Sequence, residues 1–235
     1  MKNLLKEICE KIEINITEEQ CGQFELFYQF LLEKNKVMNL TAITEKNDVV
    51  MKHFIDSIYI LRNISLSGKK IIDVGTGAGF PGIPLSIMVP DAQFVLLDSL
   101  NKRVRFLDEA SEICKITSVE AIHSRAEDAA RDENYREKFD FVLSRAVANM
   151  STLLEYCSPF VKVGGQFISY KSGQVDEELK AARHAEKMLN CKYMKSIDFV
   201  LPDTDMERKL VIYEKNGILS EKYPRQAGKP KKEPL

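Results

Sequence analysis

The hydrophobic pattern separates a helical first quarter from a longer stretch of alternating strand and helix patterns. The segment Thr17-Glu18-Glu19-Gln20 has the form of a capping box, and the apolar residues after it recur at helical spacing, which predicts a helix to about Lys34. A second helix is expected from Asn47-Asp48 to about Leu61. Residues 1–66 are therefore predicted to form an N-terminal helical cap.

From residue 67 to 217, short apolar runs alternate with helical patterns, which is typical of βαβ units and a mostly parallel sheet. The last two runs are separated only by residues 202–206, so they are predicted to form an antiparallel hairpin. We expect an α/β, Rossmann-like fold with a doubly wound seven-stranded sheet. The expected strands are 70–74, 93–98, 118–123, 139–144, 166–171, 194–201 and 208–214, and the expected helices are about 81–89, 100–114, 150–156 and 175–190.

After Asn216-Gly217 the apolar pattern is lost. Residues 218–235 carry two acids and five cations, and three prolines are interspersed. We expect a basic, poorly folded C-terminal tail, and composition leaves open whether it is merely solvated or contacts a polyanion. The cations are Lys222, Arg225, Lys229, Lys231 and Lys232.

Composition and charge exclude several classes of protein. Hydrophobic residues make up 44% and charged residues 29% of the chain, unlike disordered or fibrous proteins. Lys plus Arg total 34 against 35 for Asp plus Glu, so a polyanion would have to meet a local patch. Five cysteines without a C-x-x-C pair favour neither a disulfide framework nor a metal site. No apolar run approaches the roughly 18 residues of a membrane span, and no signal peptide is evident, so we expect a cytoplasmic protein without a membrane partner.

The strongest chemical signal is the glycine-rich loop Asp73-Val-Gly-Thr-Gly-Ala-Gly-Phe-Pro-Gly82, which follows the first expected strand. A doubly wound sheet binds its ligand at the carboxyl ends of its strands, and glycines permit a close approach of the backbone. Phe80 stands where a dinucleotide fingerprint needs its third glycine, and no Gly-Lys-Ser/Thr follows, which argues against NAD and against a Walker A loop. The loop predicts a cofactor site of another kind.

Two further strand ends add polar groups to this site. Asp98 ends the second strand, where its carboxylate can accept hydrogen bonds from vicinal ribose hydroxyls, which favours a nucleoside-containing cofactor. The alternative is that Asp98 or Ser99 caps the following helix. Ala126-Glu127, after the third strand, can read an adenine edge or simply begin the next helix.

A cation stands at the end of each of the next two expected strands. Arg145 can hold a phosphate or stack on a base, and it cannot act as a general base because it stays protonated. The alternative is an ion pair with Asp140 or Glu127. Lys171 can meet an RNA backbone or be solvated, whereas His53 and Cys157 are interpreted as core residues.

The glycine loop, Asp98 and the Ala126-Glu127 pair look like the S-adenosylmethionine site of a class I methyltransferase. Further segments from about residue 36 to the C-terminus resemble the glucose-inhibited division protein B family, also called ribosomal RNA small subunit methyltransferase G. These segments are Met38–Thr44, Lys52–Ser57, Gly79–Pro84, Leu97–Ser99, Asn101–Val104, Ser144–Ala148 and Tyr223–Arg225.

The resemblance implies methylation of N7 of a guanine in 16S (small-subunit) ribosomal RNA, with S-adenosylmethionine as donor. It places Gly75 and Phe80 at the methionine end, Asp98 and Ser99 at the ribose, Ala126 and Glu127 at the adenine, and Arg145 beside the methyl-transfer centre. Gly77 and Arg145 are also expected to bind the cofactor. Arg103, Lys171, Arg225 and Lys229 are the candidate RNA contacts.

Guanine N7 carries a lone pair and no proton, so positioning by Arg145 suffices and no catalytic acid or base is expected. The expected partner is the ribosomal RNA or the small ribosomal subunit, and we expect a monomer without a metal ion. Two other functions stay open: a small-molecule methyltransferase, and a ribosome-assembly factor that binds RNA.

Overall fold

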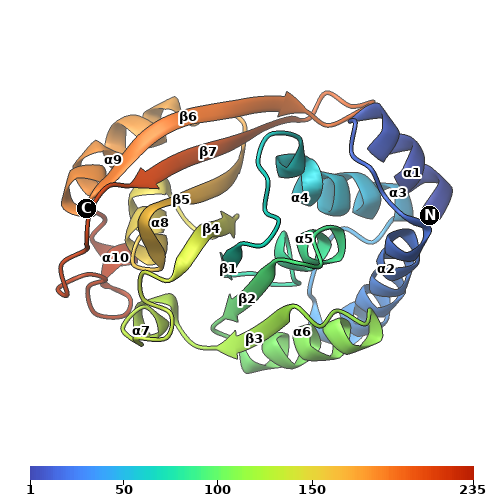
Figure 1. Cartoon of the computed structure of the whole chain (residues 1–235), viewed down its shortest axis with the longest axis horizontal. Coiled ribbons are helices and arrows are strands. Elements are labelled where there is room, and N and C mark those ends of the chain that lie inside the picture. Colours follow the sequence, from blue (N-terminus) through green and yellow to red (C-terminus); the bar gives the residue numbers. More distant parts are fainter.

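The computed structural model describes residues 1–235 as one seven-stranded sheet with helices on both faces (Figure 1). The strand order is β3-β2-β1-β4-β5-β7-β6, and β7 is antiparallel to both of its neighbours. The predicted fold class and hairpin are thus confirmed. The strands are β1 (Lys70–Val74), β2 (Gln93–Asp98), β3 (Val119–His123), β4 (Phe139–Arg145), β5 (Val161–Ser172), β6 (Cys191–Val200) and β7 (Glu207–Lys215).

The N-terminal helices pack on one face of the sheet. The capping box is confirmed, because Thr17 Oγ1 accepts from the Gln20 amide at 3.2 Å and Gln20 Oε1 accepts from the Thr17 amide at 2.9 Å. The predicted second helix is confirmed as one unbroken helical stretch from Lys46 to Arg62, which passes through four consecutive segments of α, π and 3₁₀ type. The N-terminal elements are α1 (Lys2–Lys11), α2 (Glu18–Met38), α3 (Lys46–Val49), the π-helix η1 (Val50–Ile55), α4 (Asp56–Ile58) and the 3₁₀-helix η2 (Tyr59–Arg62).

The first of two hydrophobic cores joins these helices to the sheet. Phe27 of α2 lies 5.8 Å from Phe54 of η1 and 5.5 Å from Phe80, measured between ring centroids. The same core includes residues of β1, β2, α5 (Gly82–Met88) and α6 (Asn101–Ile113). The helical extension therefore shares its core with the sheet.

The second core lies on the opposite face. It is covered by α7 (Ala126–Ala129), α8 (Met150–Cys157) and α9 (Asp176–Met188), which lie together on one side of the sheet in Figure 1. Cys157 is buried in this core, as the sequence predicts. The expected helices in this part of the chain are confirmed with small shifts of their ends.

The prediction of a poorly folded tail is wrong. Leu219 and Tyr223 are only 2% and 4% exposed, and the Arg136 guanidinium donates to their carbonyls at 3.1 and 3.0 Å. The segment then continues along α8 and ends in the short helix α10 (Lys229–Lys232). Composition did not show this because the anchoring groups belong to residues far away in the sequence.

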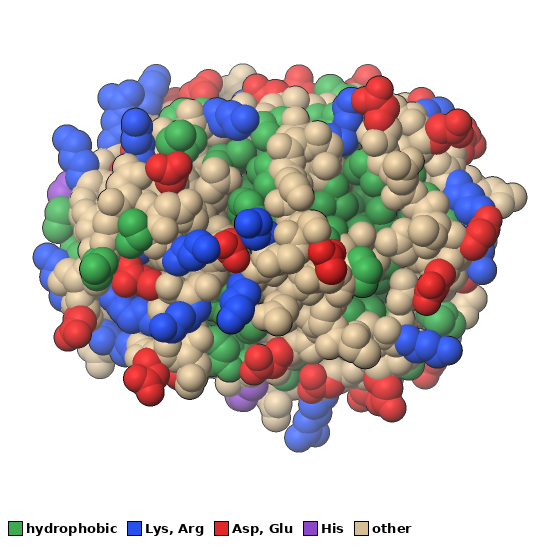
Figure 2. Space-filling view, in the orientation of Figure 1, with side chains coloured by type: hydrophobic (Ala, Val, Ile, Leu, Met, Phe, Trp, Pro, Cys, Tyr) green, Lys and Arg blue, Asp and Glu red, His purple; other side chains and the backbone are tan.

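The surface is mixed in charge. In Figure 2, Lys and Arg side chains gather over the side where α9 and α10 lie and toward the centre of the face, with acidic side chains between them. None of the helices combines the length and the apolar character that a bilayer crossing requires. No three His, Cys, Asp or Glu side chains are placed together to hold a metal ion.

Candidate functional site

The glycine loop leaves β1, and its first amides donate to the Leu97 carbonyl near the end of β2. Gly75, Gly77 and Gly79 have φ values of +75°, +62° and +87°, a region that glycine adopts without steric cost. The Gly75 amide donates to the Leu97 carbonyl at 2.9 Å, and a Cβ atom at Gly75 would lie 2.7 Å from Val147 Cγ2. The backbone conformation therefore favours glycine at position 75, and a side chain there would also have to displace Val147.

Asp73 holds this loop from inside the protein. Its Oδ2 accepts from Thr76 Oγ1 at 2.7 Å and from the Gly82 amide at 2.9 Å, while its Oδ1 is buried without a partner. Burial raises the pKa of the Asp73 carboxyl to about 6. A Cβ atom at Gly82 would overlap the Leu96 side chain. The sequence placed Asp73 in the loop motif but gave no sign of this clamping role.

Asp98 links the loop to the next helix. Its Oδ2 accepts from the Gly77 amide at 3.0 Å, and its Oδ1 accepts from the Leu100 amide at 2.9 Å just before α6. The Arg103 guanidinium lies 3.4 Å from Oδ2. Asp98 thus acts as a local anchor for helix and loop, and it also faces a cleft, so the two roles weighed from the sequence are compatible.

A cleft of about 460 Å³, here called the cofactor cleft, opens at the carboxyl ends of β1, β2 and β3. Five of the eight predicted cofactor-binding residues line it, whereas Gly77, Phe80 and Arg145 do not. A larger recess of about 740 Å³ lies at the opposite ends of these strands, beside Lys70 and Gln93, where doubly wound folds do not bind their ligands. The five lining residues are Gly75, Asp98, Ser99, Ala126 and Glu127.

A second hollow of about 350 Å³, here called the arginine recess, shares Ala146 with the cofactor cleft. In it, Arg145 Nη1 donates to Asp56 Oδ2 at 2.9 Å, and Arg208 Nε lies 3.2 Å from Asp56 Oδ1. Burial raises the pKa of Asp56, and the two guanidinium groups oppose that shift. The recess is lined by Lys52, His53, Asp56, Arg145, Ala146, Tyr170, Lys171, Ser172 and Arg208.

The ion pairs considered for Arg145 in the sequence, with Asp140 or Glu127, are wrong. Asp140 pairs with Lys162, and Glu127 accepts from a backbone amide of the tail, so neither contacts Arg145. Asp56 takes their place through an α4 segment that the sequence could not position over β4.

Phe80 packs against His53 and Arg145, two residues that line the arginine recess. It is only 5% exposed; the Arg145 guanidinium lies 5.1 Å from its ring centroid, and the His53 ring stacks on it at 4.4 Å. His53 Nε2 is 2.9 Å from Thr41 Oγ1, and burial together with Arg145 lowers the pKa of His53 to about 4. His53 is therefore neutral at pH 7 and supports the site as a packed residue.

Ala146 separates the two hollows. Its φ of +58° is uncommon for a residue with a Cβ atom, and such backbone strain concentrates at functional sites. The adjacent Val147 lies against Gly75, so the end of β4 also fixes one edge of the glycine loop.

The predicted RNA contacts divide into three groups. Arg103 lines the cofactor cleft, and Lys171 lines the arginine recess, where its Nζ lies 2.7 Å from Glu178. Lys229 is half exposed at the surface. Arg225 is instead bound to the buried Glu155, which occupies its guanidinium. Sequence reasoning missed Asp56, Arg208, Tyr156, Gly228 and Lys231 as lining residues; only Asp56 lay within a motif that had been noted.

The comparisons with known proteins agree with this architecture. Residues 20–206 match the family model GidB, described as rRNA small subunit methyltransferase G. A Lachnoclostridium phytofermentans protein called ribosomal RNA small subunit methyltransferase G is 48% identical over 94% of this chain and 92% of its own length. The protein of that name from Alkaliphilus oremlandii is 46% identical over 100% of this chain and 99% of its own.

Two solved structures share the fold at low sequence identity. M. jannaschii TYW2 in complex with AdoMet has a TM-score of 0.54 at 14% identity, covering 74% of this chain and 79% of its own. A putative O-methyltransferase from Klebsiella pneumoniae has a TM-score of 0.54 at 15% identity, covering 81% and 90%. Fold and sequence together show that the chain belongs to the GidB family of rRNA small subunit methyltransferase G.

Proposed function

We propose that this protein methylates N7 of a guanine in 16S ribosomal RNA, with S-adenosylmethionine as the methyl donor. The main support is that a nucleoside-sized cleft and a cation-lined recess meet at the strained residue Ala146. Relatives of this chain are named for methylation of small-subunit ribosomal RNA. A cytoplasmic monomer that acts on the RNA or on the small subunit is the simplest form of this proposal.

The residues of the cofactor cleft fit S-adenosylmethionine. Gly75 lines the cleft with its backbone alone, so the chain can approach a ligand closely there. The Asp98 carboxylate faces the cleft, and it retains acceptor capacity for a ribose hydroxyl beyond the two amides and the Arg103 guanidinium that donate to it. Gly75, Asp98, Ser99, Ala126 and Glu127 would hold the cofactor, which supplies an electrophilic methyl group when bound.

The arginine recess suits a base that needs no deprotonation. Guanine N7 has an in-plane lone pair, so the acceptor requires positioning rather than a general base. The Arg145 guanidinium, fixed by Asp56 and by the face of Phe80, can donate to the O6 acceptor of guanine or stack on the ring. Neutral His53 packs on Phe80; its Nε2 interacts with Thr41, and its Nδ1 is buried without a hydrogen-bond partner.

The transfer of tritium from methyl-labelled S-adenosylmethionine tests the proposal. Small ribosomal subunits, naked small-subunit RNA and total small metabolites from a strain that lacks this protein serve as acceptors, followed by nucleoside analysis. Label in 7-methylguanosine of the RNA is expected. Label only in metabolites would favour a small-molecule enzyme, and cofactor binding without label in any fraction would favour an assembly factor.

A further inference from the structure

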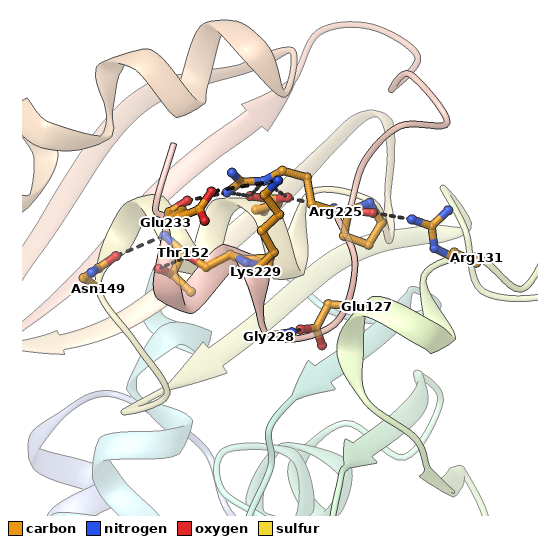
Figure 3. Close-up of polar contacts among 11 residues, drawn as sticks. Glu127, Arg131, Asn149, Thr152, Arg225, Gly228, Lys229 and Glu233 are labelled. Atoms are coloured by element: carbon orange, nitrogen blue, oxygen red, sulfur yellow. Dashed lines mark hydrogen bonds and ion pairs between the residues drawn. The ribbon is translucent and has the colours of Figure 1, made fainter.

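The C-terminal segment is fastened to α8 by a buried ion pair. The backbone amide of Arg225 and its Nε donate to Glu155 Oε1 at 2.8 and 2.9 Å, and its Nη2 donates to Oε2 at 2.6 Å (Figure 3). The Glu155 side chain is completely buried. Charge-assisted, bidentate pairs of this kind fix geometry as well as adding energy. Residue 225 is thus a fixed point from which the last ten residues depart.

Further contacts keep the following residues along α8. Thr152 Oγ1 donates to the Pro230 carbonyl at 3.1 Å, and Arg225 Nη2 donates to the Glu233 carbonyl at 2.7 Å. Arg131, two residues after α7, donates to the Pro224 carbonyl at 2.6 Å (Figure 3). The segment therefore has a defined path between α7 and α8.

This path brings the segment to the cofactor cleft. The Gly228 amide donates to Glu127 Oε1 at 2.8 Å, with Gly228 at a φ of +83°. Glu127 is only 6% exposed, and its Oε2 receives no hydrogen bond from the protein. Gly228 and Lys231 both line the cleft, together with Glu127 and Ala126 of α7.

We propose that residues 227–235 form the closing wall of the S-adenosylmethionine site. In this wall the Gly228 amide orients Glu127 so that Oε2 faces the cofactor, and Lys231 donates a hydrogen bond to the cofactor. Lys231 forms no ion pair within the protein, so its ammonium group is available to a ligand. The inference rests on the proposed function, and it assigns the tail to the cofactor rather than to RNA.

Binding of S-adenosylhomocysteine, measured by isothermal titration calorimetry, tests this wall without the RNA. A chain that ends at Gln226 keeps Arg225 against Glu155 and loses Gly228 and Lys231, so we expect about a tenfold or larger rise in Kd from two lost hydrogen-bonding groups. Lys231→Met should raise Kd about three- to tenfold. Lys232→Met is the matched control, because the exposed Lys232 does not line the cleft, and its Kd should equal that of the wild type.

The outcomes separate this inference from the proposed function. If the shortened chain and Lys231→Met bind S-adenosylhomocysteine as the wild type does, the wall is disproved while the methyltransferase proposal stands. If the wild type itself does not bind, the cofactor assignment fails. Thermal unfolding without ligand shows whether the shortened chain is folded; if it is not, an unchanged Kd for Lys231→Met alone overturns the role of Lys231.

Discussion

The cofactor cleft and the arginine recess meet at Ala146, but they are built in different ways. The cleft is formed by loops at the ends of neighbouring strands, where backbone amides and the absence of side chains decide what fits. The recess is formed largely by charged side chains from η1, α4, β4, β5 and β7, and Asp56 pairs with both of its arginines, Arg145 and Arg208. Changes in the cleft should therefore act on ligand affinity, and changes in the recess on charge balance and stability.

The largest effect is expected from Asp56→Ala. This variant leaves Arg145 and Arg208 without their shared partner, and breaking such a buried pair costs about 3 to 5 kcal/mol in the free energy of unfolding. Urea unfolding measures the change. Asp140→Ala is the control, because its partner Lys162 is half exposed and the expected loss is about 1 kcal/mol or less. Equal losses in the two variants would contradict the central role of Asp56.

The two regions should respond to pH in opposite directions. The pKa of His53 is lowered to about 4, so the folded state resists protonation and its stability falls as pH drops from about 6.5 toward 4. The pKa of Asp73 is raised to about 6, so the folded state binds a proton more readily than the unfolded chain, and stability is gained as pH drops from about 6 toward 4.

Each of these contributions is about 3 kcal/mol. Comparing the wild type with His53→Gln and with Asp73→Asn by urea unfolding between pH 4 and 7 isolates each one. His53→Gln should remove a loss of stability in acid, and Asp73→Asn should remove a gain. A profile unchanged by either substitution would show that the group does not titrate as its burial requires.

Arg145→Lys should separate transfer from cofactor binding. A lysine keeps the charge but loses the planar group that lies over Phe80 and donates to Asp56, and misplacement of an acceptor lowers rates by about a hundredfold. The Kd for S-adenosylhomocysteine should change little, because the Arg145 side chain lies in the recess. Equal losses of kcat and cofactor affinity would instead place Arg145 among the cofactor ligands.

Gly75→Ala should lower the affinity for the cofactor, whereas Arg145→Lys should lower the rate of transfer. The added methyl group meets Val147 and takes a strained backbone conformation, so Kd for S-adenosylhomocysteine should rise about tenfold or more, with about 1 kcal/mol lost in stability. Gly68→Ala is the matched control, since Gly68 has a φ of +67° and open space around it. It should lose similar stability and keep its affinity; a loss of affinity in both variants would mean that strain alone is responsible.

The smallest effect is expected from Lys171→Met at the rim of the recess. If Lys171 meets one RNA phosphate, affinity for the RNA should fall a few-fold, and the slope of log K against log salt should decrease by about one. Filter binding at several salt concentrations measures both. An unchanged slope would return Lys171 to a purely structural pairing with Glu178.

The same contrast explains how far the sequence could predict this molecule. The strands, the glycine loop, Asp98 and Ala126-Glu127 were predictable because each follows a local pattern at a strand end. The pairing of Arg145 with Asp56 joins residues 89 positions apart, and that of Arg225 with Glu155 spans 70 positions. No local period records such contacts. Arg225 was therefore predicted as an RNA contact, and the folding of the tail was not predicted.

A crystal structure with S-adenosylhomocysteine and a guanine ribonucleotide would show directly whether the cleft holds the cofactor and the recess holds the guanine. We expect adenosine in the cofactor cleft beside Asp98 and Glu127, and the guanine in the arginine recess beside Arg145, with N7 turned toward the sulfur across Ala146. Guanine bound outside the recess, or a cofactor sulfur that faces away from it, would show that these roles of the two hollows are wrong.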